Sequence, residues 1–301
     1  MSWRLVTDAI IDISEGGARL RVDLGRLVVE RAEAPPFTLP LDEIAAILVS
    51  HPAVTMSQGV LSGLAASGAI LVCCDARRMP AAMLMPIEGH FVQAERMVRQ
   101  AAAPLPLRKR LWQEIVREKL RAQARLLCAL TSSDAGLKAM AARVRSGDPE
   151  NLEAQAAVRY WPRVFGDSNF RRSRAASDQN RFLNYGYAVL RAAVARAISG
   201  VGLHPSIGLH HHNRYDAFCL ADDLMEPFRP VVDRVTASLV NERGGDAPMD
   251  RDVRSALIGA VTARYELDGE DRTLSDWIHR AAQKLADAYL GREKRLDIAV
   301  P

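Results

Sequence analysis

The chain has 301 residues, which is enough for two domains, or one large one, with a sizeable hydrophobic core. Its composition, 49% hydrophobic and 25% charged, is that of a soluble globular protein. The 40 Lys and Arg residues only slightly outnumber the 36 Asp and Glu residues. The resulting net charge of +4 allows a polyanionic partner if positive charge gathers on one face, but does not require one.

Cysteine usage, hydropathy and missing motifs exclude several classes of protein. The four cysteines form no C-x-x-C pair, which argues against a structural zinc site and favours a reduced, cytoplasmic setting. The N-terminal segment has an Asp within its apolar stretch and lacks the core of a signal peptide. No stretch reaches the roughly 18 apolar residues that span a bilayer, so no membrane is expected as a partner. No P-loop, G-x-G-x-x-G or G-x-S-x-G motif supports nucleotide hydrolysis or serine-hydrolase chemistry.

Residues 1–88 are predicted to form a small β domain. The stretch ARLRVDLGRLVVERA (18–32) alternates apolar and polar residues and predicts a hairpin that turns at its central D-L-G. Proline-bounded extended segments follow in PPFTLPLDEIAAILVS (35–50), and one short helix is expected over 57–67. The apolar run AILVCCD (69–75) is typical of a buried strand.

Residues 91–301 are predicted to form a larger all-α domain, so the chain is of the α+β class with two domains. The run PIEGHF (86–91) is the expected linker. Apolar residues line one face of a helix over 107–131, and the other face is assigned the basic residues Arg108, Arg110, Arg117, Lys119, Arg121 and Arg125. Further helical runs are expected at 150–165, 181–199, 217–241, 250–265 and 273–290. The terminal GREKRLDIAVP (291–301) has no periodicity and is expected to fray.

The stretch GLHPSIGLHHHNRYDAFCLADDLMEPFRP (202–230) concentrates histidines and then carboxylates. Successive side chains diverge in any regular backbone, so the histidines 210–212 cannot all bind one ion, although one of them can. On a helix, Glu226 shares a face with Asp222 and Asp223, and like charges so close repel unless a cation or solvent lies between them. The proline after Glu226 predicts a kink there. The alternative is a loop of structural histidines followed by a solvated acidic helix.

A further candidate acid lies upstream, in PENLEAQAAVRYWPRVFG (149–166). Glu153 falls on a helical face that is otherwise small or aromatic, from Ala156 to Trp161. Burying a carboxylate there is costly unless it is paired or binds a metal ion. Glu150, by contrast, suits the N-terminus of the helix. The alternative for Glu153 is an ion pair with one of the many arginines.

Basic and aromatic residues are interleaved in RYWPRVFGDSNFRRSRAASDQNRFLNYGY (159–187). Such a segment is suited to follow a phosphate backbone and to stack on bases. The candidate DNA contacts are Arg163, Arg171, Arg172, Arg174 and Arg181. The alternative is a solvated loop whose aromatic residues belong to the core.

Several ordered blocks of the helical domain together resemble one protein family. EAQAAVRYW (153–161) is similar to a block in which a Glu opens a small-residue helix before an aromatic pair. The chain over 180–213 resembles an Asn-rich helix that leads to a G-L-x-P-x-x-G-x-x-H turn. LADDLMEPFRPVVDRV (220–235) resembles a D-L-M-E-x-F-R-P helix, and VREKLRAQARLL (116–127) resembles a K-x-x-x-Q helix. The family is the CRISPR-associated Cas-one family, the integrase of CRISPR adaptation, and the chain looks most like its members in type II systems.

The resemblance implies a divalent-metal site and names its ligands. They are Glu153, His211 and Glu226. Asp223 matches a further acid near the metal, which either supports the ligands or is an alternate ligand. Counting along the turn selects His211, and His210 remains the alternative. One imidazole with two carboxylates suits Mg²⁺ or Mn²⁺, and Mn²⁺ matches the imidazole nitrogen better.

Two neighbouring positions are expected to stay outside the ligand set. Asp222 is interpreted as a solvated neighbour of the acids that bind metal. His204 is a departure from the family, since Asp or Asn is common at that place in the G-L-x-P turn. Because it is not a ligand position, the change leaves the implied metal site intact.

The family also implies a reaction and a set of partners. The reaction is transesterification, in which the 3′-OH of a short captured DNA attacks the backbone at the edge of a CRISPR repeat. The partners are double-stranded DNA (prespacer and CRISPR repeat), a second copy of the chain that pairs through the β domain, and the Cas-two protein in a heterohexamer-type complex. Two rival hypotheses are a non-catalytic DNA-binding scaffold and a general metal nuclease of RNA or branched DNA.

Overall fold

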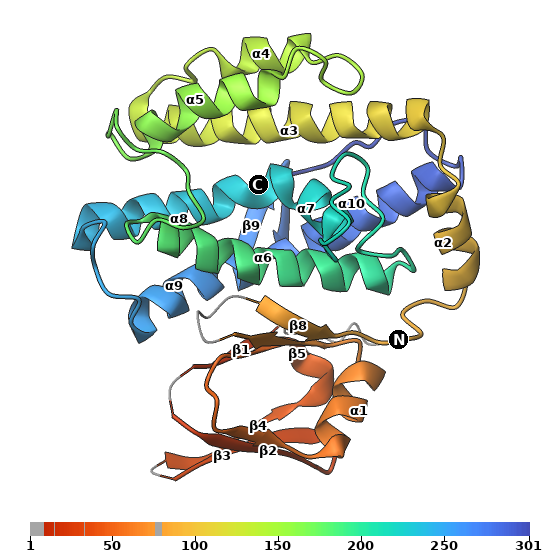
Figure 1. Cartoon of the computed structure of the whole chain (residues 1–301), viewed down its shortest axis with the longest axis vertical. Coiled ribbons are helices and arrows are strands. Elements are labelled where there is room, and N and C mark those ends of the chain that lie inside the picture. Colours follow the sequence, from red (N-terminus) through yellow and green to blue (C-terminus); the bar gives the residue numbers. More distant parts are fainter. Residues whose placement is uncertain (1–8, 15, 33, 76–79) are drawn as a thin grey trace. The chain divides into compact units, whose positions relative to one another are not determined.

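The structure of the chain is a computed structural model that describes residues 9–14, 16–32, 34–75 and 80–301. Residues 1–8, the start of the predicted β domain, lie outside the described residues. The chain divides into two compact units, Met1–Phe91 and Val92–Pro301. Strands make up most of the first unit and helices most of the second (Figure 1), which confirms the predicted fold class. Within the described ranges, no helix is both long enough and apolar enough to cross a membrane.

The first unit contains two four-stranded sheets. One has the strand order β1-β5-β7-β8. In it β1 and β7 are parallel to β5, and β8 is antiparallel to β7. The bounds are β1 Ala9–Ile13, β5 Ile44–Val49, β7 Ile70–Cys74 and β8 Pro80–Leu84. The other has the strand order β4-β3-β2-β6. In it β6 is parallel to β2, and the other pairs are antiparallel. The bounds are β4 Ala34–Pro40, β3 Arg26–Arg31, β2 Ala18–Asp23 and β6 Val54–Met56. Between β4 and β5 lies the short η1 (Leu41–Glu43), and helix α1 (Gln58–Ala66) follows β6.

The predicted hairpin is confirmed as β2 and β3, which pair in antiparallel register up to Asp23 and Arg26. Leu24 and Gly25 form its loop with φ angles of 46° and 74°. Positive φ at both positions is the geometry of the two-residue turns that match the twist of the flanking strands. The predicted short helix and the buried strand after it are confirmed as α1 and β7.

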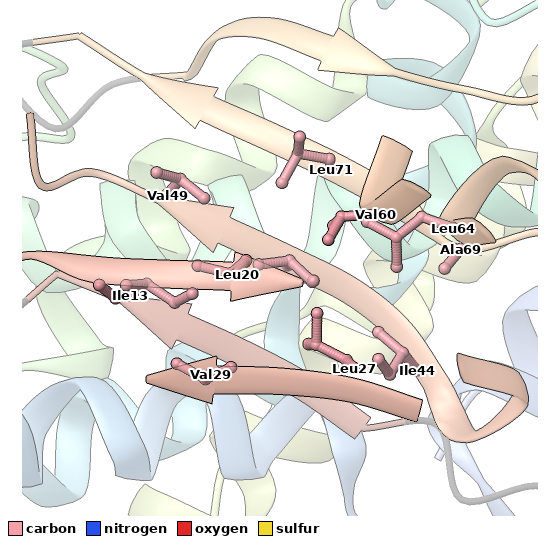
Figure 2. Close-up of a cluster of buried hydrophobic side chains, with 12 residues drawn as sticks. Ile13, Leu20, Leu27, Val29, Ile44, Val49, Val60, Leu64, Ala69 and Leu71 are labelled. Atoms are coloured by element: carbon pink, nitrogen blue, oxygen red, sulfur yellow. The ribbon is translucent and has the colours of Figure 1, made fainter. Parts of the chain in front are cut away.

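Apolar residues of both sheets and of α1 form the core of the first unit (Figure 2). In β2, Leu20 is buried while Arg19 on one side of it is exposed, as the alternation of the sequence predicts. Val60 and Leu64 of α1 are fully buried in the same cluster. Burial of each such side chain contributes about 1.5–3 kcal/mol relative to leaving it in water.

The second unit is built mainly of helices. Their bounds are α2 Gln93–Ala101, α3 Leu105–Thr131, α4 Leu137–Arg143, α5 Leu152–Val164, α6 Asn180–Gly200, α7 Cys219–Met225, η2 Glu226–Phe228, α8 Arg229–Arg243, α9 Arg251–Thr262 and α10 Leu274–Tyr289. The run predicted over 217–241 is thus divided into α7, the 3₁₀ turn η2 and α8. Pro227 lies within η2, and a proline has no N–H to continue the α-helical ladder, so the predicted kink at Glu226 is confirmed.

Two features of the second unit differ from the prediction. A hairpin of β9 (Arg264–Leu267) and β10 (Glu270–Thr273) lies between α9 and α10, so the predicted all-α domain contains two strands. The expectation of a frayed C-terminal tail is wrong, because Leu296, Ile298 and Val300 are buried. Arg125 also donates to the carbonyl oxygen of Val300 over 2.8 Å. Apolar residues at every second position fit an extended segment with one buried face, a pattern too short to stand out in the sequence.

Candidate active site

Helices α3, α5 and α7, the turn η2 and one loop bring the predicted ligands into one region of the second unit. Glu153 lies in the first turn of α5 and Glu226 begins η2. Asp223 lies near the end of α7, and His211 lies in the loop between α6 and α7. Helix α3 packs against both α5 and η2, and Figure 1 shows it alongside α5.

Glu153 is positioned by the start of its helix. The carboxylate of Asp148 accepts the backbone N–H groups of Leu152 and Glu153 over 2.9 and 3.0 Å, which satisfies two of the free donors at the N-terminus of α5. Glu150 instead pairs with Arg143 and Arg145 over 3.1 and 3.0 Å at the surface. The two glutamates are therefore separated as the sequence predicts, and only Glu153 turns inward.

Lys119 of α3 joins the two predicted glutamate ligands. Its Nζ lies 2.5 Å from Oε1 of Glu153 and 2.5 Å from Oε2 of Glu226. The periodicity of α3 places Lys119 on the basic outer face, and this prediction is wrong, because the residue is only 8% exposed. Burial works against its charge, but the two carboxylates outweigh burial and raise the pKa of Lys119. A single helix gives no sign of this, since both partners come from other elements.

Glu226 is buried and held by two cations. Its Oε1 lies 2.8 Å from a guanidinium nitrogen of Arg229, and its Oε2 faces Lys119 without a hydrogen bond of good geometry. Burial alone would raise the pKa of Glu226, but Arg229 and Lys119 together lower it below its usual value. The carboxylate is therefore ionised at neutral pH, as a metal ligand must be.

Asp223 organises the histidine loop. It is fully buried, and its two oxygens accept the backbone N–H groups of Leu209, His210 and His211 over 2.6, 3.0 and 3.2 Å. Its Oδ1 also lies 2.6 Å from Nδ1 of His211. Gly208 is required beside this turn, because a Cβ there would lie 2.2 Å from the carbonyl oxygen of His211.

The contact with Asp223 determines which nitrogen of His211 is available. A carboxylate accepts, so Nδ1 carries the proton and Nε2 is left as the nitrogen that can bind a ligand. The same hydrogen bond, opposed by burial, raises the pKa of His211. A carboxylate that bonds one nitrogen of a histidine ligand fixes the orientation of the ring. In this position Asp223 would orient His211 rather than bind the ion itself.

The neighbouring histidines diverge, as the sequence predicts. The ring of His210 stacks on Trp112 with centroids 4.4 Å apart and an interplanar angle of 5°, whereas His211 meets Trp112 edge-on at 85°. Burial lowers the pKa of His210. All three histidines are exposed, so exposure does not distinguish them. Of the three, His211 is the one whose ring is bonded to Asp223.

Asp222 differs from its prediction. It is 4% exposed, so the interpretation as a solvated neighbour is wrong. Its Oδ1 lies 3.0 Å from Nε of Arg191, and burial raises the pKa of Asp222. All residues of helix α7 are buried, so Asp222 is in contact with protein rather than with water.

The donor set is compatible with a divalent cation. In the part of the chain that the structure describes, no group of three His, Cys, Asp or Glu side chains is arranged to hold a metal ion. The two glutamates instead face the ammonium of Lys119. This ammonium shows that the space between Glu153 and Glu226 accommodates a positive charge, and His211 offers an oriented imidazole to complete the set of hard ligands.

The candidate DNA-binding arginines fall into two groups. Arg163, Arg171 and Arg174 are exposed. Arg172 donates to the side-chain oxygens of Asn180 and Asn184 over 3.0 and 2.7 Å, and so supports the loop from inside. Arg181 donates to the backbone carbonyls of residues 245 and 247 and is half-buried.

The interleaved aromatic residues also divide. Four of them are buried in the core, namely Tyr160, Phe170, Phe182 and Tyr187. Trp161 is half-buried and lines a cavity of about 560 Å³ together with Lys119, Arg171 and Asp233. Asp233 accepts the hydroxyl groups of Tyr160, over 2.7 Å, and of Tyr187. Burial raises the pKa of Asp233 to about 6.

The chain is similar to known proteins over most of its length. The family model described as CRISPR associated protein Cas1 matches residues 11–251. The chain is 34% identical over 278 residues to the CRISPR-associated endonuclease Cas1 of Neisseria meningitidis serogroup C (strain 8013), which covers 91% of this chain and 88% of that protein. The fold resembles a casposase bound to integration product, with a TM-score of 0.76, 19% identity and coverage of 96% and 92% of the two chains. It also resembles a chain of a Cas6-RT-Cas1–Cas2 complex, with a TM-score of 0.78, 16% identity and coverage of 99% of this chain and 37% of that chain.

These matches place the chain among CRISPR-associated proteins. It belongs to the Cas1 family, which confirms the family predicted from the sequence blocks.

Proposed function

We propose that this chain is a divalent-metal-dependent DNA endonuclease and integrase, which inserts short DNA fragments into a CRISPR array in the cytoplasm. The observation that carries the proposal is the pair of carboxylates, the half-buried Glu153 and the buried Glu226, that face one cation next to an oriented histidine. The name of the Neisseria meningitidis relative, an endonuclease, supports the same class of activity.

Glu153, Glu226 and Nε2 of His211 would hold Mg²⁺ or Mn²⁺, and Asp223 would fix the His211 ring rather than bind the ion. When bound, the ion activates a 3′-hydroxyl or water and stabilises charge on the phosphate. The protein contributes ligands set by α5, η2 and a loop that Asp223 holds at three backbone amides. Arg229 lies against Glu226 and keeps that carboxylate ionised.

The partners of the proposed reaction follow from charge and from the likeness to complexes. The exposed Arg163, Arg171 and Arg174 supply a surface for the DNA backbone. The likeness to a chain of a Cas1–Cas2 complex supports a Cas2 partner. Pairing of two copies through the β domain, and a heterohexamer-type assembly with Cas2, remain part of the proposal.

A strand-joining assay tests the site. Short duplexes with free 3′-OH ends and a supercoiled plasmid with the repeat are incubated with the Cas2 partner in Mg²⁺, Mn²⁺ or EDTA. Glu153→Gln, His211→Ala and Glu226→Gln should each lower joining by about a hundredfold or more, because each removes an ion ligand, while DNA affinity stays within about twofold. Glu150→Gln, a surface acid three residues from Glu153, is the matched control and should join at the wild-type rate.

The rival functions give different results in the same assay. A non-catalytic DNA-binding scaffold would bind the duplexes and join none of them with either metal. A general nuclease would cut RNA or branched DNA in preference to joining ends. Full joining by all three site variants would overturn the assignment of the ligands.

A further inference from the structure

The ammonium of Lys119 occupies the volume that a divalent ion would need. It lies 2.5 Å from one oxygen of Glu153 and 2.5 Å from one oxygen of Glu226. A divalent ion such as Mg²⁺ bound to the same two oxygens would lie at about 2.1 Å from each. Two cations cannot share that space, so one of them has to leave.

The charges of the four groups that are joined by ion pairs through Lys119 and Glu226 are already balanced. Glu153 and Glu226 contribute two negative charges, and Lys119 and Arg229 contribute two positive ones. A divalent ion added with Lys119 in place would leave two positive charges in excess among groups shielded from water, which is costly. Displacement of one ammonium reduces that excess and releases both carboxylate oxygens.

The structure provides a place for the displaced ammonium. Lys119 lines the cavity of about 560 Å³ whose other walls include Ala157, Trp161, the buried Asp233, and the arginines Arg171, Arg172 and Arg229. A lysine has a flexible four-carbon stem, so its ammonium can turn without movement of the helix backbone. The carboxylate of Asp233 and the aromatic ring of Trp161 favour a cation in this cavity, whereas the three arginines on its wall oppose one.

We propose that Lys119 is a positioning residue that takes the place of the divalent ion in the metal-free protein and turns into this cavity when the ion binds. The ammonium keeps the carboxylates of Glu153 and Glu226 together before metal arrives, and its displacement sets how tightly the ion is held. The proposal rests on the proposed metal site at Glu153, His211 and Glu226.

Titration of the full-length protein with MnCl₂ alone, followed by calorimetry and by thermal melting, tests the proposal without any DNA or activity. Lys119→Met keeps the length of the stem and removes the charge. This variant should bind Mn²⁺ about tenfold or more tightly than wild type, since no ammonium competes. Its melting temperature should fall in EDTA and should rise on Mn²⁺ addition by more than that of wild type. Lys138→Met, an exposed lysine on α4, is the matched control and should change neither property.

A second variant predicts a shift in the opposite direction. Ala157→Leu reduces the cavity and replaces none of the three ligands. It should weaken Mn²⁺ binding, because the ammonium has less room to leave, and it serves as the test if Lys119→Met does not fold in EDTA. Unchanged or weaker Mn²⁺ affinity in Lys119→Met, or unchanged or tighter affinity in Ala157→Leu, would overturn the proposal.

Failure of the underlying site is distinguishable from failure of this inference. If Glu153→Gln and Glu226→Gln bind Mn²⁺ as tightly as wild type, the ion binds elsewhere and the metal site itself is wrong. If those variants lose Mn²⁺ while Lys119→Met binds it no more tightly than wild type, the site stands and only the role of Lys119 is refuted.

Discussion

Replacement of Asp223 by asparagine removes one charge and one acceptor from the centre of the histidine loop while it keeps the shape of the side chain. The native carboxylate accepts three backbone N–H groups and the Nδ1–H of His211, two on each oxygen. An asparagine has a single oxygen, so in either orientation of the amide its NH₂ group faces two N–H donors as long as His211 keeps the proton on Nδ1.

The size of the effect follows from those two donors. Each donor left without a partner in a buried site costs about 1–3 kcal/mol, so Asp223→Asn should lose about 2–6 kcal/mol of unfolding free energy. The ring of His211 also loses the acceptor that orients it, which should weaken Mn²⁺ binding by about 10- to 100-fold. Both losses come from one contact network, so they should appear together.

Urea unfolding followed by circular dichroism, in EDTA, measures the first effect, and Mn²⁺ titration measures the second. Asp222→Asn is the matched control, since it is a buried acid on the same helix that makes its ion pair with Arg191 and holds no loop amide. It should change Mn²⁺ affinity by less than about threefold. If Asp223→Asn is within about 1 kcal/mol of wild type and binds Mn²⁺ equally well, Asp223 does not hold the loop as described.

Two further predictions concern pH and DNA. Asp233 has a folded-state pKa of about 6, above the ordinary 3.8, so its contribution to stability is full below about pH 3.8 and is lost as pH rises through 6. The unfolding free energy of wild type, measured against that of Asp233→Asn, should therefore fall by about 3 kcal/mol across this range, and parallel pH profiles would contradict it. Arg171→Gln with Arg174→Gln should weaken DNA binding and reduce its dependence on salt by about one phosphate contact each. Arg181→Gln should instead lower the melting temperature with little effect on DNA affinity, and the reverse result would refute the division between exposed and structural arginines.

Patterns within one element predict the structure well. Alternation in β2 and β3 predicts their hairpin, and the position of Pro227 predicts the break at η2. The apolar stripe around Glu153 distinguishes it from Glu150, and the structure turns the two in different directions. In each case the physical cause lies in the spacing of residues along one segment, which the sequence displays directly.

Features that depend on a partner from another element are not visible in the same way. Lys119 occupies a position that suits a solvated basic face, and only the approach of α5 and η2 makes it the buried partner of two glutamates. Asp222 is similar, since Arg191 of α6 is the group that makes its burial tolerable. The C-terminal tail is ordered by α3, through Arg125 and a buried apolar face. A sequence lists these charges but does not say which of them will meet.

The loop that carries His211 is irregular, yet the contacts along it leave little freedom. At its start, the side chain of Gln100 bonds the N–H and carbonyl of His204 and the carbonyl of Ile207, all within 2.8–2.9 Å. In the middle, Asp223 holds three successive amides. The glutamates belong to α5 and η2, and Glu226 is fixed further by Arg229. Of the charged groups that meet at the proposed ligands, Lys119 therefore combines the most flexible stem with a cavity beside it. At the proposed metal site, whose ligands are held in this way, an ion would therefore enter only if the ammonium of Lys119 moved.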